Sequence, residues 1–62
     1  MLRVGETVRL TRSGLRMRVE AIYELPNGTT EAMCCWTNGS RSRPTEHHAR
    51  FAVKYLEPVF RE

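Results

Sequence analysis

The sequence predicts a small all-β domain. Short runs alternate between apolar and polar residues, which is typical of half-buried strands. Glycine-containing pairs such as Ser13-Gly14 and Asn27-Gly28 separate these runs, as in antiparallel hairpins. The chain has 62 residues, which is enough for one domain, and its hydrophobic fraction of 40% is too high for a disordered tail. We therefore expect residues 1–62 to form a single domain with a modest core.

The first two predicted strands form an antiparallel ribbon. Residues 7–10 alternate, with Val8 on the apolar face, and residues 11–14 form a turn in which Gly14 can adopt a positive φ. Residues 15–24 form the second strand, and we expect its apolar face to contain Met17, Val19, Ala21 and Tyr23. Ile22 interrupts this alternation. The interruption predicts a bulge near residues 20–21.

The third predicted strand spans residues 31–37 and follows the turn at Asn27-Gly28, a pair that accepts positive φ at both positions. Its two faces are Ala32, Cys34 and Trp36 on one side, which we expect in the core, and Met33 and Cys35 on the other. Asn38-Gly39 predicts a second turn of the same kind. Residues 40–48 contain no apolar residue except Pro44, which predicts a mobile loop or an exposed edge strand.

The C-terminal part regains apolar residues. We expect a short strand that ends near Phe51, a helical turn over residues 52–55, and a last strand over residues 57–60. About five short antiparallel strands with tight turns in such a short chain predict a small, strongly bent SH3-like barrel.

The run from Gly5 to Val19, with Val8, Leu10 and the turn at Ser13-Gly14, resembles the opening of the YodC-like family of small uncharacterised bacterial proteins. That family opens with a Gly-Asp-x-Val-x-Leu-Lys-Ser-Gly-Gly pattern followed by Met-Thr-Val. The segment 34–39, together with Phe51, Leu56 and Pro58, is similar to its later Cys-x-Trp-Phe-x-Gly and closing Leu-x-Pro patterns. This chain departs from the pattern at Glu6, Thr11 and Arg18, and its segment 40–49 is longer. The resemblance implies a shared fold and carries no biochemical role to transfer.

The basic residues form one candidate site. The formal net charge is +3, and all but one of the ten basic residues are arginines. Arginine binds phosphates and carboxylates through a planar fork. An outer face could bind nucleic acid or a small anion through Arg9, Arg12, Arg16, Arg18, Arg41 and Arg43. The alternative is a solvated face on which these arginines pair with Glu6, Glu20 and Glu31.

Adjacent cysteines and adjacent histidines raise the question of a metal or a catalytic site. Neighbouring residues on a strand point to opposite faces, so Cys34-Cys35 and His47-His48 cannot place four ligands around one zinc ion. A Cys–His nucleophile needs a third group that orients the imidazole, and none stands at a suggestive spacing. We predict no metal, no cofactor and no enzymatic activity.

The remaining hypothesis is assembly through an exposed strand. Small β-domains often pair through edge strands or present them to a peptide. We therefore expect a non-enzymatic binding module that recognises a protein partner, or a second copy of itself, through an edge strand or the 40–49 loop. The candidate contact residues are Trp36, His47, His48 and Tyr55. A phage-encoded inhibitor or a protein that sequesters a nucleotide-like anion is also compatible.

The N-terminal residues show no signal peptide, and no apolar run is long enough to span a bilayer. We therefore expect a cytoplasmic protein with reduced cysteines.

Overall fold

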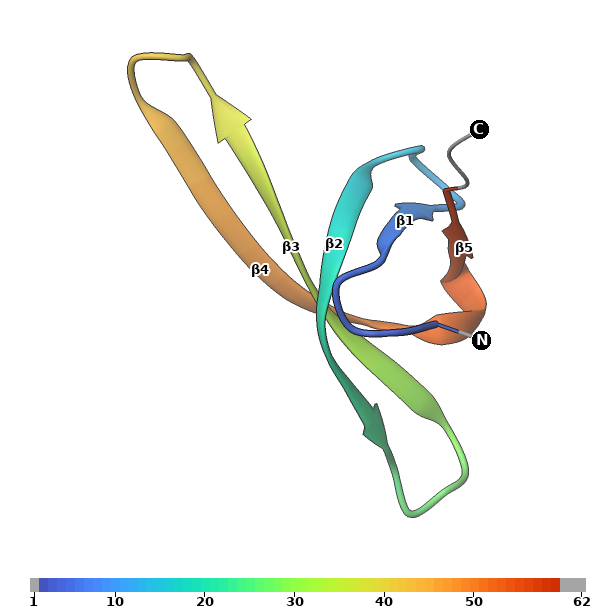
Figure 1. Cartoon of the computed structure of the whole chain (residues 1–62). Coiled ribbons are helices and arrows are strands. Elements are labelled where there is room, and N and C mark those ends of the chain that lie inside the picture. The colour runs from blue at the N-terminus through green and yellow to red at the C-terminus, as the bar shows by residue number, and fades with distance from the viewer. Residues whose placement is uncertain (1, 60–62) are drawn as a thin grey trace.

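A computed structural model describes residues 2–59 and shows one antiparallel five-stranded sheet with the order β4-β3-β2-β1-β5 (Figure 1). Its elements are β1 (Thr7–Leu10), β2 (Arg16–Glu24), β3 (Thr30–Gly39), β4 (Pro44–Ala52), a 3₁₀ turn η1 (Val53–Tyr55) and β5 (Leu56–Pro58). The predicted all-β class and the helical turn near the C-terminus are confirmed. A closed barrel stays a prediction, because the sheet order ends at β4 and β5 without joining them.

The core lies on one face of the sheet, here called the inner face. Its buried side chains come from β1, β2, β3 and β5: Val8, Met17, Val19, Ala32, Cys34 and Leu56. Partly buried residues pack around them, among them Leu10, Ile22, Trp36 and Phe51. Residues at alternate positions of each strand share a face, which explains why the predicted apolar positions Val8, Met17 and Val19 are all buried.

The predicted bulge in β2 is confirmed, and it changes which residues face the core. The pairing register between β2 and β3 shifts between Val19 and Ala21, so Glu20 is the inserted residue. Beyond it, Ile22 lies opposite the buried Ala32 and packs against the core. The prediction that Ala21 and Tyr23 share the core face with Met17 is therefore wrong. The side chain of Tyr23 is on the opposite, outer face and remains exposed.

The turn between β2 and β3 uses one glycine rather than two positive-φ residues. The Gly28 N–H donates to the Leu25 carbonyl at 3.0 Å, and the Leu25 N–H donates to the Thr29 carbonyl at 2.8 Å. Gly28 has a φ of +86°, whereas no residue other than glycine has a positive φ within residues 2–59. The predicted turn at Asn27-Gly28 is present, and only Gly28 uses the positive φ that this pair can accept. The Asn27 side chain instead accepts a hydrogen bond from the Thr29 N–H at 3.0 Å.

The second hairpin turn lies later than the sequence predicts. Asn38 and Gly39 belong to β3, where Gly39 lies opposite Pro44, and the turn comprises residues 40–43. Within it, the Arg43 N–H donates to the carbonyl of Ser40 at 3.2 Å and to its hydroxyl at 3.1 Å. Of the two alternatives for residues 40–48, the edge strand is correct from Pro44 onward, because β4 has only β3 as a neighbour.

The last strand, β5, lies at the edge of the sheet next to β1. β5 pairs antiparallel with β1, and the Thr11 hydroxyl donates to the Tyr55 carbonyl at 2.9 Å. The last strand ends at Pro58 rather than at residue 60, which lies outside the described residues. None of the helices within residues 2–59 is long and apolar enough to cross a membrane.

Candidate functional site

The β3–β4 hairpin extends beyond the rest of the sheet. β2 pairs with β3 only as far as Cys35, which lies opposite Arg18, whereas β3 and β4 stay paired to Gly39 and Pro44. Residues 36–47 therefore form a two-stranded ribbon, here called the arm, that projects away from β1 and β5 (Figure 1). A ribbon of two strands has little intrinsic stability, so the arm depends on its own cross-strand contacts or on a partner.

The hydrogen bonds of Val19 show which backbone groups of β3 point towards β4. Val19 donates its N–H to the Glu6 carbonyl at 2.9 Å and accepts from the Gly5 N–H at 2.8 Å. Both groups of Val19 therefore point towards β1. In an antiparallel ladder the direction of these groups alternates, so Cys34, the partner of Val19 on β3, directs its N–H and C=O towards β4.

The same alternation shows which groups of β4 face away from the sheet. Ala49 is opposite Cys34 and bonds towards β3, so the even-numbered residues Glu46, His48 and Arg50 direct their N–H and C=O groups to the outer edge. Pro44 lies at an even position too, where its lack of an N–H costs the ladder nothing. Within the described residues no strand pairs with this side of β4. This row of groups is called the free edge below.

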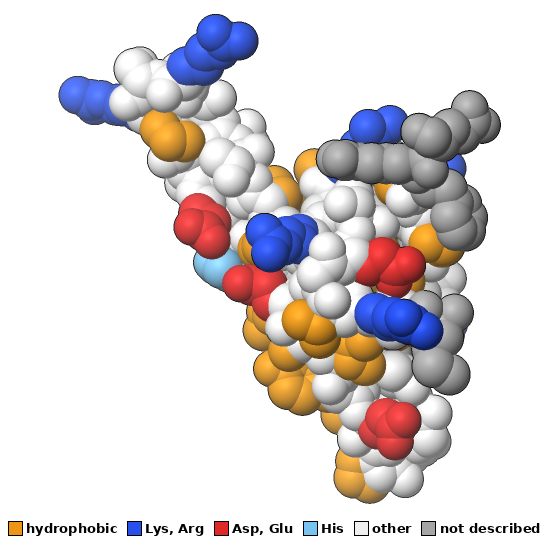
Figure 2. Space-filling view, viewed as in Figure 1, with side chains coloured by type: hydrophobic (Ala, Val, Ile, Leu, Met, Phe, Trp, Pro, Cys, Tyr) orange, Lys and Arg blue, Asp and Glu red, His pale blue; other side chains and the backbone are white. Residues whose placement is uncertain are grey.

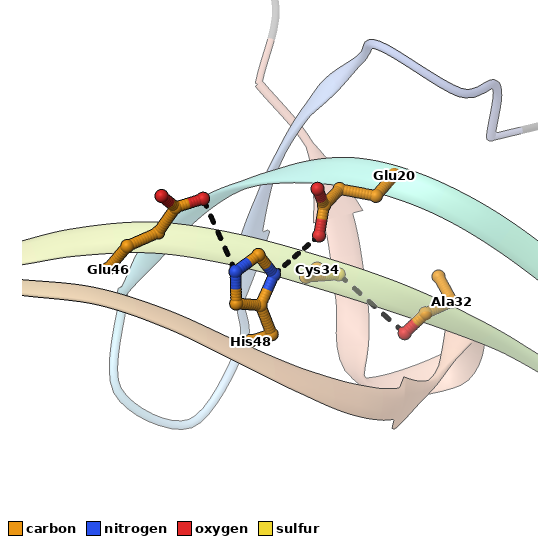
Figure 3. A network of polar contacts seen from close by, with 5 residues as sticks. All are labelled: Glu20, Ala32, Cys34, Glu46 and His48. Atoms are coloured by element: carbon orange, nitrogen blue, oxygen red, sulfur yellow. Dashed lines mark hydrogen bonds and ion pairs between the residues drawn. The ribbon is translucent and has the colours of Figure 1, made fainter.

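A polar network lies on the outer face at the base of the arm. His48 Nδ1 is 2.6 Å from Glu20 Oε1, and His48 Nε2 is 3.3 Å from Glu46 Oε1 (Figure 3). Each ring nitrogen of His48 therefore faces a carboxylate oxygen. The network ties β4 to the bulge of β2 across the intervening strand β3. The sequence pattern did not identify Glu20 and Glu46 as partners of His48, although the interrupted alternation at Ile22 predicted the bulge that brings Glu20 there.

Arg50 extends the charged row of β4. Its guanidinium is 3.1 Å from the carboxylate of Glu31 and lies 4.4 Å from the ring centre of Tyr23. Glu46, His48 and Arg50 occupy alternate positions of one strand and therefore share the outer face. The outer row of β4 thus reads acid, imidazole, base in order along the chain.

Aromatic side chains gather on the inner face of the arm and at its base. Trp36 stacks on His47 with ring centres 5.5 Å apart and an interplanar angle of 20°, and contacts Phe51 in a tilted arrangement at 6.3 Å. Trp36 packs against the core, as expected, but stays partly exposed. His47 and His48 are consequently on opposite faces, and only His47 belongs to the aromatic group.

Tyr55, the remaining candidate contact residue, lies away from the arm on η1. With Leu10, Arg12 and Phe51 it lines an open surface hollow of about 340 Å³. The ammonium of Lys54 lies 5.1 Å from the centre of its ring. A second open hollow, of about 370 Å³, is lined by Arg18, Glu20, Cys35 and Glu46 together with Val4, Gly5 and Val19.

The six candidate arginines do not form one surface. Arg9 lies directly opposite Arg16 on the neighbouring strand, and Arg18 follows two residues later on the same face. Arg9 is 3.2 Å from Glu57 of β5, so part of its charge is balanced within the chain. Arg41 and Arg43 belong to the turn at the end of the arm, and Arg12 belongs to the β1–β2 turn. Figure 2 shows basic side chains at the end of the arm, separated from those over the main sheet.

The two cysteines have different environments, and both are free thiols. Cys34 is fully buried, with its Sγ 3.8 Å from the Ala32 carbonyl, whereas Cys35 is partly exposed on the outer face. Burial raises the pKa of the Cys34 thiol, and the neighbouring Cys35 and Glu20 raise it further. Cys34 is therefore a protonated core residue at neutral pH. Within residues 2–59, no three His, Cys, Asp or Glu side chains converge as they would around a metal ion.

No protein-family model, curated protein or solved structure matches this chain.

Proposed function

We propose that this chain is a non-enzymatic binding module that recognises a protein partner through the free edge of β4 and the arm. The observation that carries the proposal is the nine-residue strand β4, which is paired on one side only within the described part of the chain. Membership of the YodC-like family, an SH3-like barrel and a cytoplasmic location are further proposals, which rest on the sequence patterns alone.

An extended segment of a partner can add to the sheet as a neighbour of β4. The outward N–H and C=O groups of Glu46, His48 and Arg50 would supply main-chain hydrogen bonds, which give affinity without regard to sequence. Specificity would come from side chains on both faces: the charged outer row, and His47 with Trp36 on the inner face. Glu46 and His47 lie on the arm, beyond the main sheet, whereas His48 and Arg50 lie at its base, where β3 still pairs with β2.

The alternative is binding of nucleic acid or a small anion by the outer face of β1 and β2. The cross-strand pair Arg9 and Arg16, with Arg18 beside it, supports this reading. Such binding would depend strongly on salt, because it exchanges counterions for arginines. The Glu57 carboxylate beside Arg9 opposes it.

A comparison of three variants tests the proposal. His48→Pro removes an outward N–H without removing a bond to β3, whereas His48→Ala removes the side chain and keeps that N–H. The double change Arg16→Glu with Arg18→Glu reverses the charge of the alternative site. Each protein is isolated gently from its host at low and at moderate salt, and the native mass of what it carries is determined.

We expect the wild type to carry a stoichiometric protein partner or a second copy at both salt concentrations. His48→Pro should lose it, whereas His48→Ala and the arginine variant should retain it. Co-purifying nucleic acid or a small anion that is lost with salt and in the arginine variant would instead establish the alternative. A wild-type chain that carries nothing and does not self-associate would overturn the proposed function.

A further inference from the structure

We propose that the strand that pairs with the free edge of β4 is β4 of a second copy, antiparallel and centred on His48. This inference rests on the proposed function, since it names the occupant of the same edge. The order of charges along β4 and the direction of its backbone groups both favour this pairing.

The outer row of β4 is self-complementary when it is reversed about His48. In an antiparallel pair centred there, Glu46 of each copy lies opposite Arg50 of the other, and the two His48 residues face each other. All three positions direct their N–H and C=O groups to the free edge, so each pair can form main-chain hydrogen bonds. Opposite charges directly across an antiparallel pair stabilise it, and this register contains that pair twice.

Neighbouring registers lack this match. In a dimer with a two-fold axis perpendicular to the sheet, the outer faces of both copies lie on the same side. The axis must then pass next to a residue that faces its own copy, so the neighbouring registers are those centred on His47 and on Ala49. Centred on His47, the pairing sets Arg50 against Pro44 of the other copy. Centred on Ala49, it sets Arg50 against His48 and leaves Glu46 opposite Ala52. Only the His48 centre pairs an acid with a base at both ends.

The side chains involved have bonding capacity left for the second copy. Arg50 uses one terminal nitrogen for Glu31 at 3.1 Å, and a guanidinium carries five N–H donors. Glu46 uses Oε1 for a long contact of 3.3 Å to His48, so its second oxygen can accept from the other copy. The existing pairs can therefore persist in the dimer.

The inner face supports the same register. His47 of one copy would lie opposite Ala49 of the other, and Thr45 opposite the partly buried Phe51. The stacked Trp36 and His47 would then be next to apolar surface of the second copy. The six buried side chains found within residues 2–59 are a small core, and a domain of this size gains stability by association.

Charge reversal tests both the dimer and its register. In Glu46→Arg every copy carries two bases in the outer row, and in Arg50→Glu every copy carries two acids. Each homodimer then has like charges opposite each other, whereas a mixture of the two variants restores both opposite-charge pairs. The oligomeric state of each variant and of the equimolar mixture is measured by sedimentation over protein concentrations from about 1 μM to about 1 mM.

We expect the wild type to form a dimer. Each single variant should raise the dissociation constant of the dimer about tenfold or more, which corresponds to 1.4 kcal/mol. The mixture should form a heterodimer of near wild-type affinity. Glu24→Arg and Arg16→Glu change the same charges on exposed strand positions away from the free edge, and should leave the dimer intact. Circular dichroism of every variant reports whether the sheet persists.

A wild-type chain that stays monomeric at about 1 mM would overturn the inference, as would a dimer that neither single variant weakens. A mixture that fails to form the heterodimer would exclude the His48 register. If the chain is monomeric but captures another protein in a manner that His48→Pro abolishes, the inference fails and the proposed function stands. If neither kind of partner depends on the free edge, both fail.

Discussion

Gly39 is the position where a single methyl group should damage the arm most. Its φ is +96°, and a Cβ built there would lie 2.8 Å from the carbonyl oxygen of Arg43. A positive φ costs an L-residue about 1–2 kcal/mol. The close approach to a backbone oxygen adds about 1–3 kcal/mol, because the turn has to move to relieve it. We therefore expect Gly39→Ala to lower the free energy of unfolding of the arm by about 2–5 kcal/mol.

Gly28→Ala is the matched control for this change. Gly28 also has a positive φ, of +86°, and also lies at a hairpin turn, but a Cβ there meets no atom within 4 Å. It should cost only the conformational term of about 1–2 kcal/mol. The difference between the two variants isolates the contact with Arg43.

The assay uses the chain's one tryptophan, which lies at the base of the arm. Urea unfolding followed by Trp36 fluorescence reports the arm, and far-ultraviolet circular dichroism reports the whole sheet. In the Gly39 variant the fluorescence transition should occur at lower urea than in the Gly28 variant. If the arm unfolds separately, the two signals will no longer coincide. Equal losses in the two variants would refute the reasoning about the close approach.

Three further outcomes follow from the core and the charged surface. The raised pKa of Cys34 means that the native state holds the thiol proton more tightly than the unfolded chain, so its stabilising effect is complete below the ordinary value of 9.0 and is lost as pH rises through the folded pKa. Urea unfolding under reducing conditions should show this decline in stability at alkaline pH, and the decline should be smaller in Cys34→Ala. An equal decline in Cys34→Ala would contradict the raised pKa of Cys34. Val8→Ala, at a fully buried position, should lower the free energy of unfolding by about 1.5–3 kcal/mol in the same assay, and a loss below about 0.5 kcal/mol would show that Val8 is not a core residue. The exposed pair Arg9–Glu57 should contribute at most about 1 kcal/mol, measured as the coupling in a double-mutant cycle with alanine, and high salt should remove it.

Local pattern was sufficient to predict most of the strands and the bulge. Alternation placed Val8, Met17 and Val19 on one face because side chains on a strand repeat every second residue. The same rule placed Tyr23 wrongly, since one inserted residue at Glu20 reverses every face that follows it. The position of a bulge can be inferred from interrupted alternation. Which face of the sheet the following side chains occupy depends on which residue is left out of the ladder.

The candidate site was harder to predict because it depends on register between distant strands. His48 was identified as a contact residue, but its partners Glu20 and Glu46 became apparent only once β2, β3 and β4 were aligned. Asn38-Gly39 illustrates the same limit in a turn: its composition suits a hairpin loop, yet both residues pair with Thr45 and Pro44. Tertiary pairing over the ten residues of β3 outweighed local turn preference.

The position of β5 beside β1 sets an order on folding. The β3–β4 hairpin closes through a turn of residues 40–43, so its contacts form between near neighbours and at little entropic cost. The contact between Thr11 and Tyr55 spans 44 positions, and β1 cannot complete its ladder until β5 has been synthesised. The hairpin that contains the free edge can therefore form while the core beneath β1 is still open. Association through β4 before that core closes would join two partly folded chains. The rate at which β5 docks beside β1 sets how long the chain stays in this partly folded state.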